Sequence, residues 1–181
     1  MHLPSLVGEM HGCDIMKEIL LQYALYNVWA HQKIFDTIRG LSEEQIHRQI
    51  ASSFPSIFKT GLHLMDAESM WWQRLKLSER VERPSELFTG NISDLEKQLL
   101  QQSGIWAEWV RNANEQQLLH VFAYQNTKKE QFKQPVKEVL LHIFNHSTYH
   151  RGQIIVIFHQ LSVEKIPNTD FIGYTRNKNN R

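Results

Sequence analysis

The stretch PVKEVLLHIFNHSTYHRGQIIVIFHQL (residues 135–161) decides the fold, because its apolar residues recur at helical spacing along its whole length. Pro135 is expected to open this helix, since a proline without an N–H group is tolerated in a first helical turn. The helix is expected to end near Ser162. Three other stretches of the chain show the same periodicity, so the protein is predicted to be all-α.

The other long helices are predicted at residues 14–40, 52–77 and 93–113. Pro55 lies near the start of the second of them, and Ser93 and Asp94 are expected to cap the third. The residues expected to face the core are Ile15, Ile19, Tyr23, Tyr26, Ala30 and Ile34 in the first helix, and Leu95, Leu99, Trp106 and Val110 in the third. Four long helices predict a four-helix bundle.

The connections between these helices differ in character. Ser42 with Gln45 has the pattern of a capping box and predicts a short turn of helix. The charged segment 78–91 is predicted to be a loop, and the segment 118–134, the longer crossover before the fourth long helix, is compatible with a short hairpin or an irregular connection. Segment 164–181 is expected to be extended. The predicted organisation is an N-terminal extension (1–13), a bundle domain (14–175) and a frayed C-terminal tail (176–181).

Composition excludes several classes of function. The 181 residues contain 20 Lys and Arg against 19 Asp and Glu, a formal net charge of +1. A nearly neutral chain does not indicate binding to nucleic acid or to a membrane surface. The single cysteine, Cys13, excludes an internal disulfide. The longest strongly apolar run is too short to span a bilayer, and no signal peptide is evident, so a cytoplasmic protein is expected.

Histidines at intervals of four residues mark the fourth helix as a candidate metal site. Successive members of the set His142, His146 and His150 are separated by about 40° of rotation and about 6 Å of rise. His146 and His150 can therefore bind one ion together. All three histidines cannot bind the same ion, because His142 and His150 are about 12 Å apart along the helix axis. Spacing leaves open which outer histidine is the ligand. His159 points to the opposite face.

A zinc-like ion needs three or four ligands, so a further helix must contribute. His63 in the second long helix shares a face with Ala67 and Met70, where it is either a ligand or a hydrogen-bonded core histidine. Spacing alone does not decide between these two interpretations. The segment HSTYH has Ser147 where the zinc-protease pattern H-E-x-x-H places its glutamate, which argues against a protease of that type.

Four segments together resemble the DinB-like family of bacterial metal-binding four-helix bundles: YALYNVWAHQKIFDTIRGLS, GLHLMDAESMWWQRL, HIFNHSTYHRGQI and IPNTDFIGY. The resemblance implies that His63, His146 and His150 bind one divalent ion per chain, zinc or nickel, with positions left for water. His142 would then either support a ligand or be a hydrogen-bonded core histidine.

Other residues of these segments receive expected roles from the same resemblance. Arg151 is expected to form a structural ion pair with a loop or a partner subunit, and small Gly152 to allow close approach of a neighbouring helix. Glu68 is expected either to orient a ligand or to pair with an arginine such as Arg74, and Asp170 to anchor the tail. Asn145 and Gln153 also match the family. The residues expected in the core or the pocket wall are Tyr26, Trp71 and Trp72.

The function implied is transfer of a low-molecular-weight thiol to an electrophile, because characterised members of the family include thiol transferases. Two alternatives remain open. A metal-bound hydroxide would hydrolyse a small ester, amide or lactone. Alternatively, a structural ion with a fourth ligand such as Asp66 or Glu68 would serve a non-catalytic stress-response protein. The family resemblance also implies a homodimer that acts on a small molecule.

Overall fold

A computed structural model describes residues 12–179, and the side chains of residues 15–176. Residues 1–11 of the predicted extension, and residues 180 and 181 of the predicted tail, lie outside the described part. The protein is mainly helical, as predicted. Its long helices are α1 (Gly12–Ile38), α3 (Ile57–Leu75), α4 (Ile92–Asn112) and α6 (Val136–Gln160).

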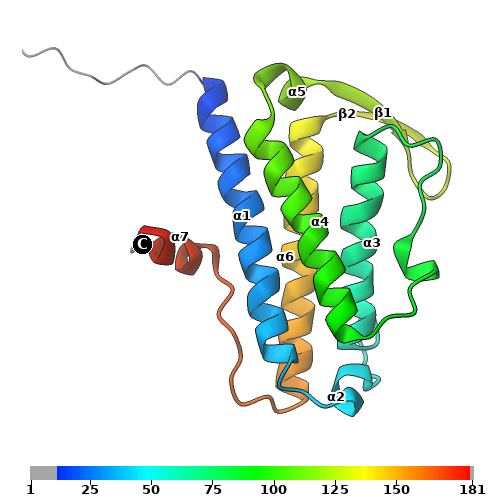
Figure 1. Cartoon of the computed structure of the whole chain (residues 1–181), viewed down its shortest axis with the longest axis vertical. Helices are drawn as coiled ribbons and strands as arrows, with labels where there is room; N and C mark the ends of the chain where they lie inside the picture. Colours follow the sequence, from blue (N-terminus) through cyan, green and yellow to red (C-terminus); the bar gives the residue numbers. More distant parts are fainter. Residues whose placement is uncertain (1–11, 180–181) are drawn as a thin grey trace, which may run out of the picture.

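These four helices form the predicted bundle. In Figure 1, α1 and α6 run in one direction and α3 and α4 in the other. Each of α1 and α3 packs against both α4 and α6, so α3 and α6 are neighbours that run antiparallel. Of the helices described, none has the length and apolar character needed to cross a membrane.

Short elements lie at the two ends and along the sides of the bundle (Figure 1). They are α2 (Glu43–His47), the 3-10 turn η1 (Pro84–Glu86), α5 (Glu115–Leu119), β1 (Val121–Gln125), β2 (Gln131–Pro135) and α7 (Phe171–Asn179). The two strands pair antiparallel, from Val121 with Pro135 to Gln125 with Gln131, which confirms the hairpin. Its turn has Lys129 in the left-handed region at φ 65°.

The C-terminal segment differs from the prediction. It is not extended throughout, because it ends in the helix α7. The first turn of α7 is closed by a hydrogen bond from the Tyr174 N–H to the Asp170 carbonyl oxygen. Tyr26 on α1 holds the segment in place by donating its hydroxyl to the Thr169 carbonyl oxygen at 2.7 Å. The Asp170 side chain is exposed, so the anchor of the tail is Tyr26 rather than the Asp170 carboxylate.

Helix caps explain where the long helices begin. The capping box of Ser42 and Gln45 is confirmed. Helix α3 begins after Ser56, whose hydroxyl accepts from the Lys59 N–H, so Pro55 lies outside the helix. Helix α4 is capped by Asn91, and Asp94 completes the capping box; Ser93 lies inside the helix and was wrongly assigned as a cap.

The core follows the predicted face of α4 but only part of that of α1. The side chains expected to face inward from α4 are all buried: Leu95, Leu99, Trp106 and Val110. On α1, Ile15 and Ile19 are 43% and 56% exposed, whereas Leu20 and Ala24 are buried. The prediction was therefore wrong for the first turns of α1, where the helix presents a face rotated by about one residue, or about 100°.

The close approach of two helices occurs at Gly61 rather than at Gly152. A Cβ atom added at Gly61 would lie 2.9 Å from the Leu95 side chain of α4. A Cβ at Gly152 would meet nothing within 4 Å, and this residue is exposed. The expectation for Gly152 was therefore wrong within the described chain.

Candidate metal centre

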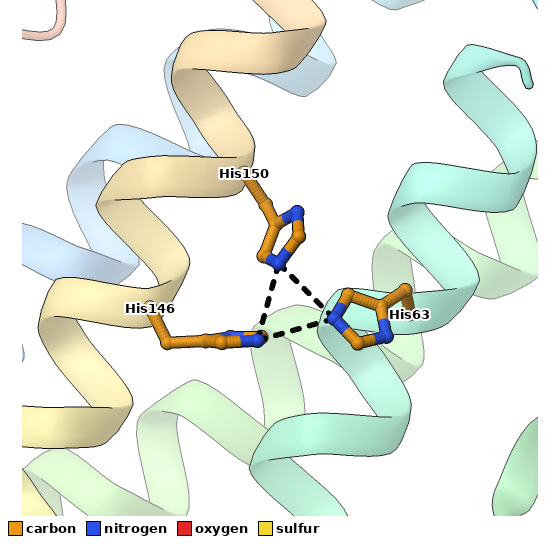
Figure 2. Close-up of side chains that lie close together, drawn as sticks. All are labelled: His63, His146 and His150. Carbon is orange, nitrogen blue, oxygen red and sulfur yellow. Dashed lines mark hydrogen bonds between the residues drawn. The ribbon is translucent and has the colours of Figure 1, made fainter. Parts of the chain in front are cut away.

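The structure brings three of the ten histidines together between α3 and α6. The Nε2 atoms of His63, His146 and His150 form a triangle whose three sides are each 3.1 Å (Figure 2). His150 is buried, and the other two rings are half-buried. Because α3 and α6 run antiparallel side by side, one histidine of α3 meets two histidines from successive turns of α6.

Hydrogen bonding alone cannot account for this triangle. The Nε2 atom of a neutral imidazole either carries a hydrogen or has a lone pair, but not both. Among three such atoms at least two are of the same kind, so at least one of the three contacts joins two donors or two acceptors. A shared cation removes this conflict, because all three atoms can then present lone pairs to it.

The arrangement fits a divalent ion in ligand type and in spacing. Around a tetrahedral zinc ion with zinc–nitrogen distances of about 2.0–2.1 Å, neighbouring nitrogens lie about 3.3 Å apart. The observed 3.1 Å sides are close to that value. Within the described residues, these three histidines form the group of possible ligands, with no carboxylate among them. The cluster could therefore hold a metal ion with coordination positions to spare.

The electrostatics keep the three imidazoles neutral. Burial, then the neighbouring His150, lowers the pKa of His63 from 6.5 to about 4. Burial, then the neighbouring His150, His63 and His142, lowers the pKa of His146 to about 3. Burial also lowers the pKa of His150, partly offset by its hydrogen bond with Gln153. At neutral pH all three side chains therefore have a lone pair available for a ligand bond.

The metal-free protein is expected to lose stability as the pH falls from about 6.5 to about 5. Because the pKa values of His63 and His146 are depressed in the folded state, the unfolded chain takes up protons in this window that the folded chain does not. The free energy of unfolding therefore decreases with decreasing pH. Urea denaturation in the presence of a chelator measures it.

The matched control is the double variant His63→Gln with His146→Gln, which should show a shallower pH dependence over the same window. Carboxylates titrate mainly below it and contribute little to the comparison. An unchanged slope in the double variant would contradict the assigned pKa shifts.

Gln153 orients His150. The Gln153 Oε1 atom lies 2.8 Å from His150 Nδ1, and the Gln153 amide nitrogen donates to Ser53 Oγ at 3.1 Å. An amide oxygen only accepts, so His150 Nδ1 carries the hydrogen and Nε2 has the lone pair that faces the other two histidines. Gln153 matches the family pattern, but this role was not predicted for it. Gln153 lies three residues after His150 on one helix face, and this spacing is the local signal that could have indicated the contact.

Replacing Gln153 by leucine is expected to weaken metal binding about 10- to 100-fold, because His150 loses the partner that fixes its tautomer. Gln153→Glu keeps an acceptor at this place and is expected to retain most of the affinity. Competition with a chromogenic chelator measures both. Equal affinity in the wild type and Gln153→Leu would show that His150 is held by other contacts.

Phe54 covers the cluster from the loop between α2 and α3. Its ring stacks on His63 with centroids 4.0 Å apart and contacts the edge of His150 at 5.5 Å. Ser53, bound to Gln153, comes from the same loop. Neither residue was predicted from the sequence, because their contacts with α6 join a loop to a helix about a hundred residues further along the chain.

Glu68 is buried in the centre of the bundle and does not reach the histidine cluster. Its carboxylate accepts hydrogen bonds from Asn27 and His31 of α1, Ser103 of α4 and Ser147 of α6. Burial alone would raise the pKa of Glu68, but the hydrogen bonds, first that from His31, hold it below its ordinary value. Both expected roles, orienting a ligand and pairing with Arg74, were therefore wrong.

Arg151 belongs to the same network rather than to an ion pair with a loop. It donates to the Asn27 side-chain oxygen at 2.5 Å, while the Asn27 amide nitrogen donates to Glu68 at 2.8 Å. The Arg151 guanidinium also lies 5.3 Å from the centre of the Tyr26 ring. The Asn27 amide thus links a buried cation to a buried carboxylate, and the expected ion pair with a loop is not formed within the described chain.

The remaining candidates lie around the cluster without joining it. His142 is exposed, with its ring 5.7 Å from that of His146 and 5.3 Å from that of Trp71, so it is not a core histidine. Asp66 accepts two hydrogen bonds from Ser85. Trp72 packs on Trp106 in the core. Asn145 is exposed.

Known proteins share this fold and this sequence pattern. The family model described as "DinB family" matches residues 16–181, a range that contains all three clustered histidines. Protein DinB of Bacillus subtilis (strain 168) is 30% identical over 165 residues, covering 86% of this chain and 93% of that protein. The crystal structure of a DinB-like protein from Bacillus cereus ATCC 10987 aligns with a TM-score of 0.65 and 18% identity, covering 83% of this chain and 95% of that one.

Proposed function

The chain belongs to the DinB family, and on that basis we propose that it holds one divalent ion through His63, His146 and His150 and uses it to transfer a small thiol to an electrophile. Zinc or nickel is the proposed ion, since neutral imidazoles suit both metals. The observation that carries the proposal is the triangle of three neutral Nε2 atoms with no carboxylate in the group.

When bound, a divalent ion with three neutral ligands keeps its full charge and lowers the pKa of a coordinated thiol or water. The protein's own residues set the conditions for that chemistry. Gln153 keeps the hydrogen of His150 on Nδ1, and Phe54 covers one face of the His63 ring. The exposed His142 ring lies beside the His146 ring and contacts Trp71.

The carboxylates near the cluster favour thiol transfer over hydrolysis. Hydrolysis by a metal-bound water is usually assisted by a carboxylate that accepts a proton. Asp66 is occupied by Ser85, and Glu68 is buried among hydrogen-bond donors, so neither carboxylate is free to take this role. The same engagements leave neither of them to close a structural site as a fourth ligand. These contacts support a reactive ion.

The test uses N-acetylcysteine and 1-chloro-2,4-dinitrobenzene as probes. In the reaction a carbon–sulfur bond forms, the carbon–chlorine bond breaks, chloride leaves and the thiol proton passes to the buffer. We expect the zinc- or nickel-loaded protein to accelerate it, and the metal-free protein and His150→Ala not to do so. Equal rates in all three samples would refute the transferase proposal, and metal-dependent cleavage of p-nitrophenyl acetate alone would favour a hydrolase.

We also propose the homodimer that the family resemblance implies. Its test is the molar mass in solution, which should be twice the 21.4 kDa of one chain.

A further inference from the structure

Arg74 carries a buried charge that nothing in the described chain neutralises. It lies in the last turn of α3, half-buried, with its guanidinium carbon 4.6 Å from the centre of the Trp71 ring and 5.8 Å from that of Tyr124. Its Nε atom is buried without a hydrogen-bond partner. No ion pair within the described residues includes it. An arginine stays protonated even when burial lowers its pKa, so Arg74 keeps its positive charge at this half-buried place.

The same guanidinium lines a cavity that is large enough for a small molecule. The cavity, of about 1160 Å³, is lined by residues from the C-terminal end of α3, from the loop 78–87 that follows it and from the hairpin. Its two other arginines already face carboxylates. Arg80 lies 3.9 Å from Glu82, and Arg83 lies 3.9 Å from Asp66. Arg74 is thus the arginine of this cavity with no acidic partner in the described part of the chain.

The chemistry of the lining indicates the kind of ligand. Four basic side chains line the cavity against three acidic ones, an excess of one positive charge. The Arg74 guanidinium lies over the Trp71 ring, and its N–H groups are donors of the kind that bind a carboxylate. Apolar groups are available for the rest of the ligand, since Met70, Leu77, Val81, Leu87 and Tyr124 also line the cavity.

We propose that this cavity binds a small organic molecule with one carboxylate group and that Arg74 anchors the carboxylate. The site lies on the same side of the bundle as the histidine cluster, because Trp71 contacts both Arg74 and His142, and His142 contacts His146. The inference goes beyond the proposed thiol transfer and does not require a bound metal.

Phenylacetate and phenylacetamide form a matched pair of probes, with the same shape and with or without the charge. We expect the wild-type protein to bind phenylacetate in the millimolar range and at least about tenfold more tightly than the amide. Arg74→Gln should abolish this difference, and Arg74→Lys should keep part of it. Arg80→Gln, which changes an already paired arginine, should bind within about twofold of the wild type.

Titration followed by calorimetry and by the amide signals of the hairpin provides the measurement. His150→Ala should bind phenylacetate as the wild type does, so failure of the metal proposal and failure of this one give different results. Without ligand, Arg74→Gln should fold as the wild type does, because the replaced guanidinium is half-buried and makes no ion pair within the described residues. Equal binding of the two probes, no binding of phenylacetate at about 10 mM, or unchanged binding in Arg74→Gln would overturn the proposal.

Discussion

Replacing His150 by alanine is expected to reduce the metal content of the protein from close to one divalent ion per chain to less than about a tenth of that. His150 is the most buried member of the cluster, and its Nε2 atom is 3.1 Å from each of the other two. Two remaining imidazoles cannot compete with water and buffer for the ion. Elemental analysis of untagged protein, loaded and then dialysed, gives the ratio of metal to chain.

His142→Ala is the matched control for this loss. His142 lies one turn before His146 on the same helix but outside the triangle, so its replacement should leave the metal content unchanged. Circular dichroism should show the helical fold in both variants. If the wild type cannot be loaded with zinc or nickel, the cluster is structural and the transferase proposal falls with it. If His150→Ala keeps its ion, the ligand set is different.

Replacing Glu68 by alanine is expected to lower the free energy of unfolding by about 3–5 kcal/mol. The Glu68 carboxylate is fully buried and accepts four side-chain hydrogen bonds from the other three long helices. Without it, these donors have no acceptor, and the buried charge of Arg151 loses its counter-charge. Urea denaturation of the metal-free protein measures the difference without a contribution from the ion.

Two further variants serve as comparisons for Glu68→Ala. Glu68→Gln keeps the shape of the side chain but removes its charge and turns an amide N–H₂ group toward hydrogen-bond donors. We therefore expect its free energy of unfolding to lie between those of the wild type and Glu68→Ala. Glu164→Gln changes an exposed carboxylate and should stay within about 0.5 kcal/mol of the wild type. A loss below about 1 kcal/mol for Glu68→Ala would mean that the helices re-pack or that water replaces the carboxylate.

The features predicted correctly from the sequence are those set by neighbouring residues. The capping box at Ser42, the hairpin around residues 121–135 and the buried stripe of α4 all follow from local spacing and turn chemistry. The meeting of His63 with His146 and His150 required more than spacing, because it depends on which helices are neighbours. Family resemblance supplied that information.

The features that were missed depend on contacts across the bundle. Ile15 and Ile19 have helical spacing but lie on the exposed face of α1, and periodicity does not fix how a helix is rotated against its neighbours. Asn27 and His31 are polar residues of the core because Glu68 faces them from α3. Their burial could not be deduced from α1 alone. Arg74 was named as a possible partner of Glu68, but Glu68 lies in the bundle core and Arg74 lies over the Trp71 ring.

The hydrogen bonds of Gln153 connect the α2–α3 loop to His150, and they would therefore couple this loop to an ion held by the histidine cluster. One amide group contacts His150 through its oxygen and Ser53 through its nitrogen, so a rearrangement of the loop also disturbs the group that selects the tautomer of His150. Coupling of this kind is reciprocal. If a bound ion stabilises the ordered loop by some free energy, an ordered loop strengthens binding of the ion by the same free energy. A molecule that displaces Phe54 from His63 would therefore lower the affinity of the cluster for a metal. Movement of the loop would also change the rate at which the metal exchanges.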